Sequence, residues 1–567
     1  MIRTRMSNLP RRRSRLGVTA LLGLSALLAV SGCSAVPSTG PVHQGLSDLH
    51  QAEQLVQFNP LGPVVDSTKE DIVRGFVLAA TSSAGDYAVA REFLTPEYAG
   101  QWDPAYGVLI DDGSRPYRED DDDAAVLELT ATAKVDADGM LLPVAPGGST
   151  DMRFELERVN GQWRIASAPA GIILDRATFT AIWSAHQIYF IGPTGVLIPE
   201  TRWFQSRAAL STEIVNALLE GPGERVAGVV HSGFPPGTEL VTGAVTVVDG
   251  VARIELSQEV LEAGEQAAKE MFRQLHQSMR TVTGVNGFEV VVDGVEVREP
   301  DAGETQPSVP PAEPSNPAVM IGDQFGTVVA GEFVATERLG DAIVSLGPDA
   351  VVLSPDESAA AVRNGEGISR VDDEVTRLVD QRGGLLVPSF DPMGYIWTLP
   401  AGGGELRVTG GVDETYTIEA PWLRELTPAA ISVSPDGARL AVLVPAEGNR
   451  SVVYTAGIVR EANGAPVRTT ATVDAQLWAS GNPIDIDWVD TLRFATLTES
   501  GNTSKVTVGG PGLFAAEQGS VAGGDQIASG GSRTQLRVLS GDGDLYMSQG
   551  SGWQRLIGDV EVLAKRG

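Results

Sequence analysis

Cys33 is the residue whose chemistry the sequence singles out most clearly, because it is the only cysteine among 567 residues. An apolar run over 16–31 leads into Gly32 and this thiol, and six arginines without any acidic residue precede the run. A basic segment, an apolar segment and small residues in this order are typical of a secretory signal that is later removed. We therefore expect residues 1–32 to direct export and to take no part in the fold.

The four residues Val30, Ser31, Gly32 and Cys33 resemble the lipobox of bacterial lipoproteins. In such proteins the thiol receives a diacylglyceryl group as a thioether, and the chain is cut just before the cysteine. The small residues Ser31 and Gly32 leave the backbone accessible to the peptidase. The resemblance implies cleavage between Gly32 and Cys33, S-diacylglycerol and N-acyl (palmitate-type) groups on Cys33, and attachment to the extracytoplasmic face of the cell membrane. An uncleaved membrane anchor with a core cysteine is the alternative.

The composition excludes several classes of protein. A hydrophobic content of 42% is enough for packed cores, so the chain is not intrinsically disordered. The formal charge of −31 repels phosphate backbones and argues against nucleic-acid binding. With one cysteine the chain forms no internal disulfide. No run after the leader approaches the roughly 20 apolar residues that cross a bilayer.

The first half of the chain predicts two α+β domains. Residues 33–63 are polar and rich in Pro and Gly, so we expect a tether. In 64–180, Ser67 and Glu70 have the spacing of a capping box, and helical periodicity then gives way to alternating strands similar to the NTF2-like fold. In 181–299 we expect strands, the hairpin turn Asp249-Gly250 and a long helix over 258–283.

Segments of the second domain resemble the GerMN module of exported bacterial proteins: Leu218-Leu219-Glu220-Gly221-Pro222, Phe234-Pro235-Pro236-Gly237-Thr238 and Gly284-Val285-Asn286-Gly287-Phe288. These motifs are turns and core residues, so they imply a fold without indicating catalysis. Residues 300–318 contain six prolines and are expected to form an extended linker.

The region 319–567 has the character of an all-β propeller. Short apolar runs recur at intervals near the length of a propeller blade and carry a common turn signature, such as Ser434-Pro435-Asp436-Gly437. We expect about five or six blades, and a pair of β-sandwiches is the alternative. Tryptophans in these strands are expected to pack between blades, with stacking on sugars as the alternative: Trp397, Trp422, Trp488 and Trp553.

The order lipobox, NTF2-like domain, GerMN-like domain and propeller resembles the actinobacterial LpqB lipoprotein family. That resemblance implies an accessory protein that interacts with the sensor histidine kinase MtrB and modulates the MtrAB two-component system in cell-wall homeostasis and cell division. The sequence contains no G-x-S-x-G, G-x-x-x-x-G-K or H-E-x-x-H motif, so we expect no enzyme, cofactor or metal site. The alternative function is binding of cell-wall glycan or muropeptide, with or without hydrolysis, in the propeller channel.

Overall fold

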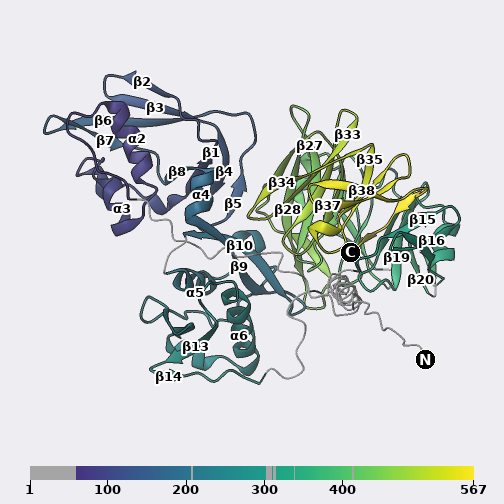
Figure 1. The fold of residues 1–567 in the computed structure, drawn as a ribbon. Coiled ribbons are helices and arrows are strands. Elements are labelled where there is room, and N and C mark those ends of the chain that lie inside the picture. The colour runs from purple at the N-terminus through teal and green to yellow at the C-terminus, as the bar shows by residue number, and fades with distance from the viewer. Residues whose placement is uncertain are drawn as a thin grey trace, which may run out of the picture. The chain divides into compact units, whose positions relative to one another are not determined.

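The computed structural model describes residues 59–205, 209–301, 310, 314–337, 339–373, 375–411 and 414–567. The described residues all belong to one compact unit by their contacts. In the described part the chain runs through two α+β domains into a large all-β domain (Figure 1). The predicted multidomain fold class, with α+β domains followed by an all-β C-terminal domain, is therefore confirmed.

The N-terminal domain packs short helices against two four-stranded sheets, ordered β2-β3-β6-β7 and β5-β4-β1-β8. Its helices are α2 (Lys69–Ala79), α3 (Ala84–Arg91) and α4 (Arg176–Ile182). Its strands are β1 (Val108–Asp111), β2 (Tyr117–Asp121), β3 (Ala124–Leu129), β4 (Ala131–Val135), β5 (Leu141–Pro143), β6 (Thr150–Val159), β7 (Gln162–Ser167) and β8 (Ile172–Asp175). Phe76 on α2 reaches the ring of Phe154 on β6 at 6.3 Å between centroids, which ties the helix to the sheet.

The start of α2 lies one residue later than the sequence predicted. Thr68, and not Ser67, is the N-cap: its hydroxyl accepts the backbone N–H of Asp71 at 3.2 Å, and the Asp71 carboxylate accepts the N–H of Thr68 at 3.0 Å. Both Ser67-Glu70 and Thr68-Asp71 have capping-box spacing, so the pattern alone does not separate the two registers.

The second domain begins with the hairpin of β9 (Trp183–Ile191) and β10 (Leu197–Gln205), followed by α5 (Leu210–Glu220). A four-stranded sheet follows in the order β11 (Thr246–Val248), β12 (Val251–Glu255), β13 (Gly287–Val292), β14 (Val295–Glu296). The helix α6 (Glu265–Met279) connects the parallel strands β12 and β13. The predicted helix over 258–283 is interrupted, because Gly264 is an extended N-cap that separates α6 from a short 3-10 turn.

Between residues 314 and 567, the described segments form six sheets of four or five strands, each one a propeller blade. The first three are β39-β15-β16-β17, β40-β18-β19-β20-β21 and β22-β23-β24-β25. Their strands are β15 (Ala318–Ile321), β16 (Gln324–Val329), β17 (Glu332–Ala335), β18 (Ala350–Leu353), β19 (Ala359–Asn364), β20 (Gly367–Asp372), β21 (Thr376–Asp380), β22 (Ser389–Phe390), β23 (Ile396–Thr398), β24 (Arg407–Thr409) and β25 (Thr415–Thr417), with the helix α7 (Gly340–Ser345) beside β16.

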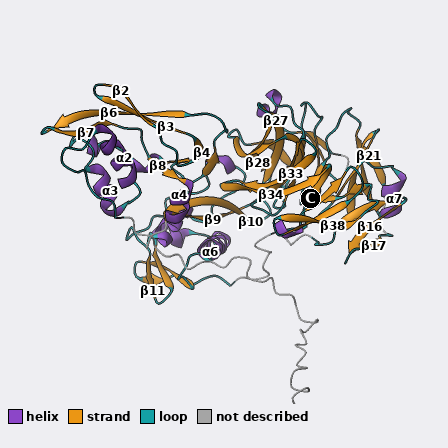
Figure 2. Ribbon diagram, turned by 45° about the horizontal axis from the view of Figure 1, so that its top comes forward, coloured by secondary structure: helices purple, strands orange, loops and turns teal. Residues whose placement is uncertain are grey.

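The other three blades are β26 to β29 with β30, then β31-β32-β33-β34, then β35-β36-β37-β38. Their strands, with the two closing strands, are β26 (Ala430–Val433), β27 (Arg439–Ala446), β28 (Arg450–Arg460), β29 (Pro466–Thr469), β30 (Asp474–Ser480), β31 (Asn482–Trp488), β32 (Phe494–Ser500), β33 (Thr503–Gly510), β34 (Leu513–Ala522), β35 (Gly524–Ala528), β36 (Arg537–Ser540), β37 (Leu545–Gln549), β38 (Gly552–Ile557), β39 (Val562–Leu563) and β40 (Lys565–Arg566). Figure 2 shows the helices concentrated in the two α+β domains.

The last residues of the chain close the propeller. Strand β39 pairs antiparallel with β15 of the first blade, and β40 pairs parallel with β18 of the second blade. Both ribbon views place the C-terminus among the propeller strands (Figures 1 and 2). The closure removes an open sheet edge, which would otherwise pair with other chains.

The repeated turn signature has one geometry in two blades. In the second blade the Ser354 hydroxyl donates to Asp356 Oδ1 at 2.6 Å and accepts the N–H of Ala359 at 3.0 Å. In the fourth blade Ser434 donates to Asp436 and accepts the N–H of Arg439 at 3.0 Å. The Ser and Asp side chains thus satisfy backbone donors inside the turn, which explains why Ser-Pro-Asp recurs at the first bend of a blade.

A fully buried ion pair supports the third blade. Arg460 Nη2 lies 2.7 Å from Asp391 Oδ2, and neither side chain is exposed to solvent. The same carboxylate accepts the Trp397 indole N–H at 3.0 Å and the backbone N–H groups of Met393 and Tyr395 at 3.0 and 2.9 Å. The Asp391 carboxylate therefore orders the turn, the tryptophan and the arginine together.

We expect Arg460→Met to destabilise the propeller by about 3–5 kcal/mol, because it leaves the Asp391 charge buried without its partner. The double variant Arg460→Met/Asp391→Asn removes both charges and should recover much of the loss. Urea denaturation followed by tryptophan fluorescence measures both. A double variant that is less stable than Arg460→Met would contradict the buried charge as the cause.

Candidate functional site

Cys33 and Gly32 lie outside the described residues, so lipid attachment and signal cleavage stay predictions. Among the described residues no helix is long and apolar enough to cross a bilayer. In the same part of the chain, no three His, Cys, Asp or Glu side chains gather as metal ligands.

The propeller tryptophans take structural positions. Trp397 and Trp488 are 0% and 2% exposed, which leaves no ring face for a sugar. Trp422 and Trp553 are half-buried, and their indole N–H groups donate to Thr469 Oγ1 at 2.9 Å and to the Gln518 carbonyl at 3.0 Å. The structure thus agrees with packing of Trp397 and Trp488 in the blades and contradicts sugar stacking on them.

One mouth of the propeller channel forms a cavity of about 320 Å³, lined by residues at or near the innermost strands. Lys565 on the closing strand β40 lines it, and its Nζ lies 2.5 Å from Asp485 Oδ1 and 2.8 Å from the Ile486 carbonyl. None of the four tryptophans lines this mouth. Asp487 lies on β31, two residues after Asp485. It is buried, and its carboxylate accepts the N–H of Ser529 at 2.8 Å.

Burial raises the pKa of Asp487 to about 6, and the nearby Lys565 only partly opposes this. Because the folded state binds the Asp487 proton more tightly than the unfolded state, this carboxyl favours folding at pH below 4. That contribution is lost as the pH rises from about 4 to about 6. Above pH 6 we therefore expect Asp487→Asn to have a free energy of unfolding higher than that of the parent by at most about 3 kcal/mol. This difference should shrink as the pH falls towards 4.

Urea unfolding of both proteins at pH 4.5 and pH 7.5 measures this difference. Asp542→Asn, on an exposed turn, is the matched control and should behave as the parent at both pH values. A stability difference for Asp487→Asn that does not change with pH would refute the titration of this carboxyl.

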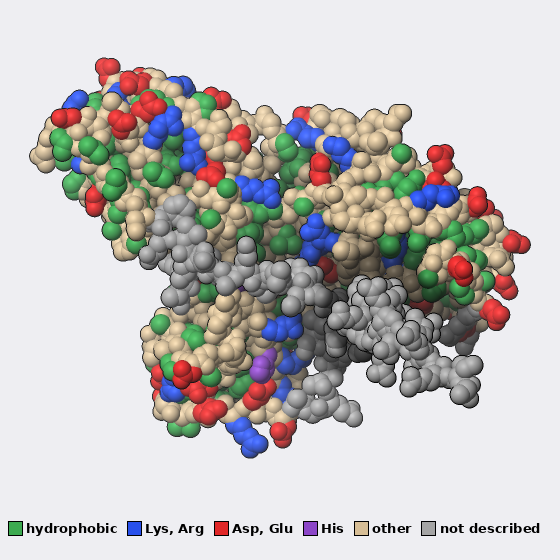
Figure 3. Space-filling model, in the orientation of Figure 1, with side chains coloured by type: hydrophobic (Ala, Val, Ile, Leu, Met, Phe, Trp, Pro, Cys, Tyr) green, Lys and Arg blue, Asp and Glu red, His purple; other side chains and the backbone are tan. Residues whose placement is uncertain are grey.

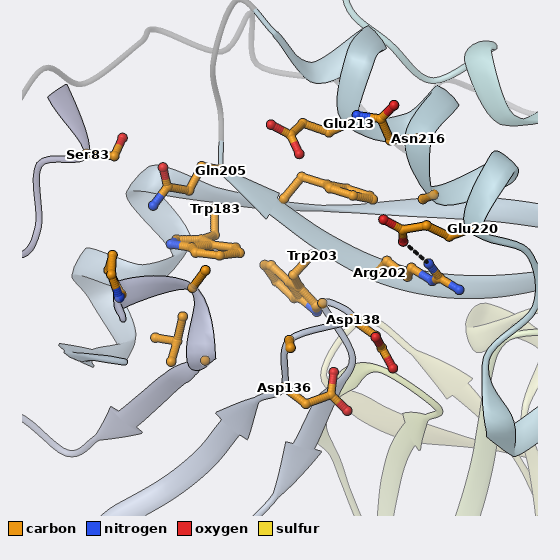
Figure 4. Close-up of a pocket in the computed structure, with 18 of the residues that line it drawn as sticks. Ser83, Asp136, Asp138, Trp183, Arg202, Trp203, Gln205, Glu213, Asn216 and Glu220 are labelled. Carbon is orange, nitrogen blue, oxygen red and sulfur yellow. Dashed lines mark ion pairs between the residues drawn. The ribbon is translucent and has the colours of Figure 1, made fainter. Parts of the chain in front are cut away.

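A cavity of about 500 Å³ lies where the N-terminal domain meets the β9–β10 hairpin and α5. We call it the junction pocket (Figure 4). Its walls come from α3, the β4–β5 turn, both hairpin strands and α5, through the following residues, among others: Asp86, Tyr87, Asp136, Asp138, Trp183, Arg202, Trp203, Phe204, Gln205, Glu213, Asn216 and Glu220.

The aromatic wall of the junction pocket is held by several contacts. Trp183 stacks on Phe179 with ring centroids 5.7 Å apart and an interplanar angle of 17°. The Trp203 indole donates to the Gly512 carbonyl of the propeller at 2.8 Å. The backbone N–H of Trp203 donates to the Gly139 carbonyl at 2.7 Å. A Cβ at Gly139 would lie 2.8 Å from the Trp203 carbonyl oxygen, so this approach requires glycine.

The rim formed by α3 has an unusual backbone. Gly85, Asp86 and Tyr87 have φ angles of 59°, 58° and 58°, and a left-handed tyrosine is rare. The Tyr87 hydroxyl accepts the side-chain amide of Gln205 at 2.8 Å, which links the rim to the end of β10. Strained backbone of this kind concentrates at ligand sites.

The charges around the junction pocket are unevenly compensated. Arg202 is 3% exposed and pairs with the buried Glu200 at 3.0 Å. Asp136 pairs with Arg225 at 3.1 Å, and Arg225 also pairs with Asp474 of the propeller at 2.6 Å. By contrast, Asp138 and Glu213 form no ion pair with any residue that the structure describes.

Arg225 thus joins three domains through its two ion pairs. Burial acts against its charge, but Asp474 and Asp136 together raise the pKa of Arg225 above its ordinary value. Arg439 of the propeller also donates to the Pro199 carbonyl of β10. These contacts hold the junction together and position Asp136 beside the pocket.

Sequence reasoning did not find the junction pocket. Its residues come from segments separated by up to about 130 positions and share no motif spacing. The only local signal is the cluster of aromatic residues Trp203 and Phe204 at the end of a strand, which is equally typical of a core strand.

Family models match three successive parts of the chain. Residues 62–180 match the N-terminal domain of lipoprotein LpqB, 187–298 match a domain described as sporulation and spore germination, and 326–562 match the lipoprotein LpqB β-propeller domain. The fold is thus that of a modular protein that joins a GerMN-like domain to a propeller. The chain belongs to the LpqB lipoprotein family, since both LpqB models match in order and together cover more than half of it.

Individual relatives agree with this assignment. Lipoprotein LpqB of Streptomyces avermitilis is 26% identical over 93% of this chain and 94% of its own. The Bifidobacterium longum protein is 25% identical over 75% of each chain, and that of Rhodococcus opacus is 32% identical over 41% of this chain and 39% of its own. All three are named as lipoproteins.

Solved structures with similar parts have low overall scores. The match to the first GerMN domain of the sporulation protein GerM from Bacillus subtilis spans 20% of this chain and 86% of that structure, at 14% identity and a TM-score of 0.18. A gluconolactonase from Xanthomonas campestris covers 45% of this chain and 89% of its own, at 13% identity and a TM-score of 0.29.

Proposed function

We propose that this protein is an exported, lipid-anchored accessory protein that contacts the extracytoplasmic domain of the sensor histidine kinase MtrB and modulates MtrAB signalling in cell-wall homeostasis and cell division. The observation that carries the proposal is membership of the LpqB lipoprotein family over nearly the whole described chain. In this role the protein binds and positions a partner without catalysing a reaction.

The lipid anchor explains how a weak contact between this protein and the kinase can be populated. Lipid chains at Cys33 confine the domains to the layer beside the membrane, where the outer domain of a kinase also lies. Confinement raises the effective concentration of the two partners without any new contact between them. Modulation additionally requires the accessory protein to bind two kinase states with different affinity, because equal binding shifts no equilibrium.

The joined domains suit such a role. Arg225 links all three domains, and Trp203 and Arg439 add hydrogen bonds between the hairpin and the propeller. A rigid body transmits a preference for one partner shape better than loosely tethered domains, because less conformational entropy is lost on binding. On the face in Figure 3, acidic side chains occur on every domain, with Arg and Lys dispersed among them, so a partner surface with exposed basic groups is favoured.

Crosslinking in intact cells followed by co-purification tests the contact. We expect MtrB to be recovered with the parent protein above the level of an unrelated lipoprotein with the same anchor. Recovery of MtrB at the background level, with the protein correctly lipidated and abundant, would contradict the proposal.

A further inference from the structure

The junction pocket combines aromatic faces with carboxylates that the described residues leave uncompensated. Its cavity of about 500 Å³ falls within the range typical of small-molecule sites. Trp183, Trp203 and Phe204 supply one wall. Asp138 and Glu213 reach the cavity from the β4–β5 turn and from α5, and Figure 4 shows them on opposite sides of the two indole rings.

The charge balance selects against an anionic ligand. Among the lining residues that the structure describes, Arg202 is the only basic side chain, and the buried carboxylate of Glu200 already accepts a hydrogen bond from it. The Asp136 carboxylate is likewise engaged, by Arg225. Asp86 pairs with Arg91 at 2.9 Å, and Glu220 lies 3.9 Å from Arg202. Asp138 and Glu213 are therefore the lining carboxylates without a described ion pair, and the field in the cavity attracts a cation.

The aromatic wall adds a second preference for a cation. Ammonium groups are attracted to the faces of indole rings, and this attraction grows where water is displaced. Stacking on Phe179 and the hydrogen bond to Gly512 hold the two indoles in place. A ligand therefore meets rings that are already ordered, which lowers the entropic cost of binding.

We propose that the junction pocket binds an organic diamine, with its carbon body against Trp183 and Trp203 and its two ammonium groups directed to Asp138 and Glu213. A carboxylate on each side of the rings suits a molecule with a positive group at each end. Asn216 and Gln205 also line the cavity and offer amide oxygens as further hydrogen-bond acceptors. A free polyamine has this chemistry, whereas a diamino acid within a wall peptide keeps only one free ammonium group, because its α-amine is part of a peptide bond.

Calorimetric titration of the full-length lipoprotein in neutral detergent tests the proposal. The probes are spermidine and a muramyl peptide that contains a diamino acid, with an N-acetylglucosamine oligomer as the uncharged probe. We expect saturable binding of spermidine that weakens as salt is raised. The peptide has one free ammonium group and tests whether both carboxylates contribute, so we expect it to bind more weakly than spermidine.

The double variant Asp138→Asn/Glu213→Gln keeps the shape of the pocket and should weaken amine binding at least tenfold. The matched control Asp323→Asn/Glu97→Gln makes the same two chemical changes at exposed positions outside the pocket lining, and should bind as the parent does. Thermal melting of both variants checks that they fold.

Three results would overturn the proposal. One is the absence of saturable binding of spermidine. Another is an equal loss of binding in the control variant, since bulk charge would then explain the attraction. The third is binding of the uncharged oligomer in preference to both amines, which would make the pocket a site for neutral sugars.

Discussion

Cys33→Ala is expected to abolish lipid incorporation, the largest effect of any single substitution in this chain. Cys33 is the only thiol, so no other side chain can form the thioether. A single acyl chain binds membranes only marginally, with an association constant of about 10⁴ M⁻¹, whereas two or more chains give stable anchoring. Loss of one sulfur atom therefore removes the whole anchor that the lipobox implies.

Metabolic labelling with an alkyne fatty acid, followed by mass spectrometry of the N-terminal peptide, measures this result. The parent should carry lipid on Cys33 and lack residues 1–32, and Cys33→Ala should carry no label. Ser34→Ala, at the adjacent position, is the control and should be labelled as the parent is. A parent protein with an intact leader or an unmodified thiol would contradict lipid anchoring.

Deletion of the closing strands, residues 562–567, is expected to lower the melting temperature of the propeller by about 10 °C or more. Val562, Leu563 and Ala564 are at most 3% exposed, and the burial of large apolar side chains stabilises by about 1.5–3 kcal/mol each. In a domain of this size each kcal/mol corresponds to about 2–4 °C. The deletion also removes Lys565 from Asp485 and Arg566 from Glu357, at 2.5 and 2.8 Å.

Differential scanning calorimetry of the full chain measures the effect. Leu563→Asp, which buries a charge in β39, should also lower the melting temperature. Asp559→Asn lies just before β39 in an exposed turn and serves as the control that should leave the transition unchanged. A deletion variant that melts with the parent would show that β39 and β40 do not close the propeller.

The sequence predicted the fold where local chemistry determines structure. The hairpin turn at Asp249-Gly250 is present between β11 and β12, and both residues have positive φ, at 51° and 83°. The Ser-Pro-Asp turns formed because their side chains bond the backbone within a few residues. Where two registers were equally compatible with the pattern, as at Ser67 and Thr68, the local sequence could not decide between them.

Contacts between segments far apart in the chain could not be predicted from the local sequence. Arg225 forms ion pairs with Asp136 and Asp474, which lie 89 and 249 positions away in the sequence. The residues next to Arg225 in the sequence give no sign that it links domains. The junction pocket depends on such contacts, so its aromatic and acidic residues could not be grouped from their spacing. Burial is likewise a property of the folded chain, which is why Trp397 and Trp488 were open to two interpretations before the structure placed them in the core.

The rate of MtrB autophosphorylation in vesicles that also contain the lipidated protein tests modulation of the kinase most directly. We predict a change of at least several-fold relative to vesicles with the kinase alone, and a smaller change when the protein is added without its lipid. A rate that stays the same at saturating amounts of the lipidated protein would contradict modulation of this kinase.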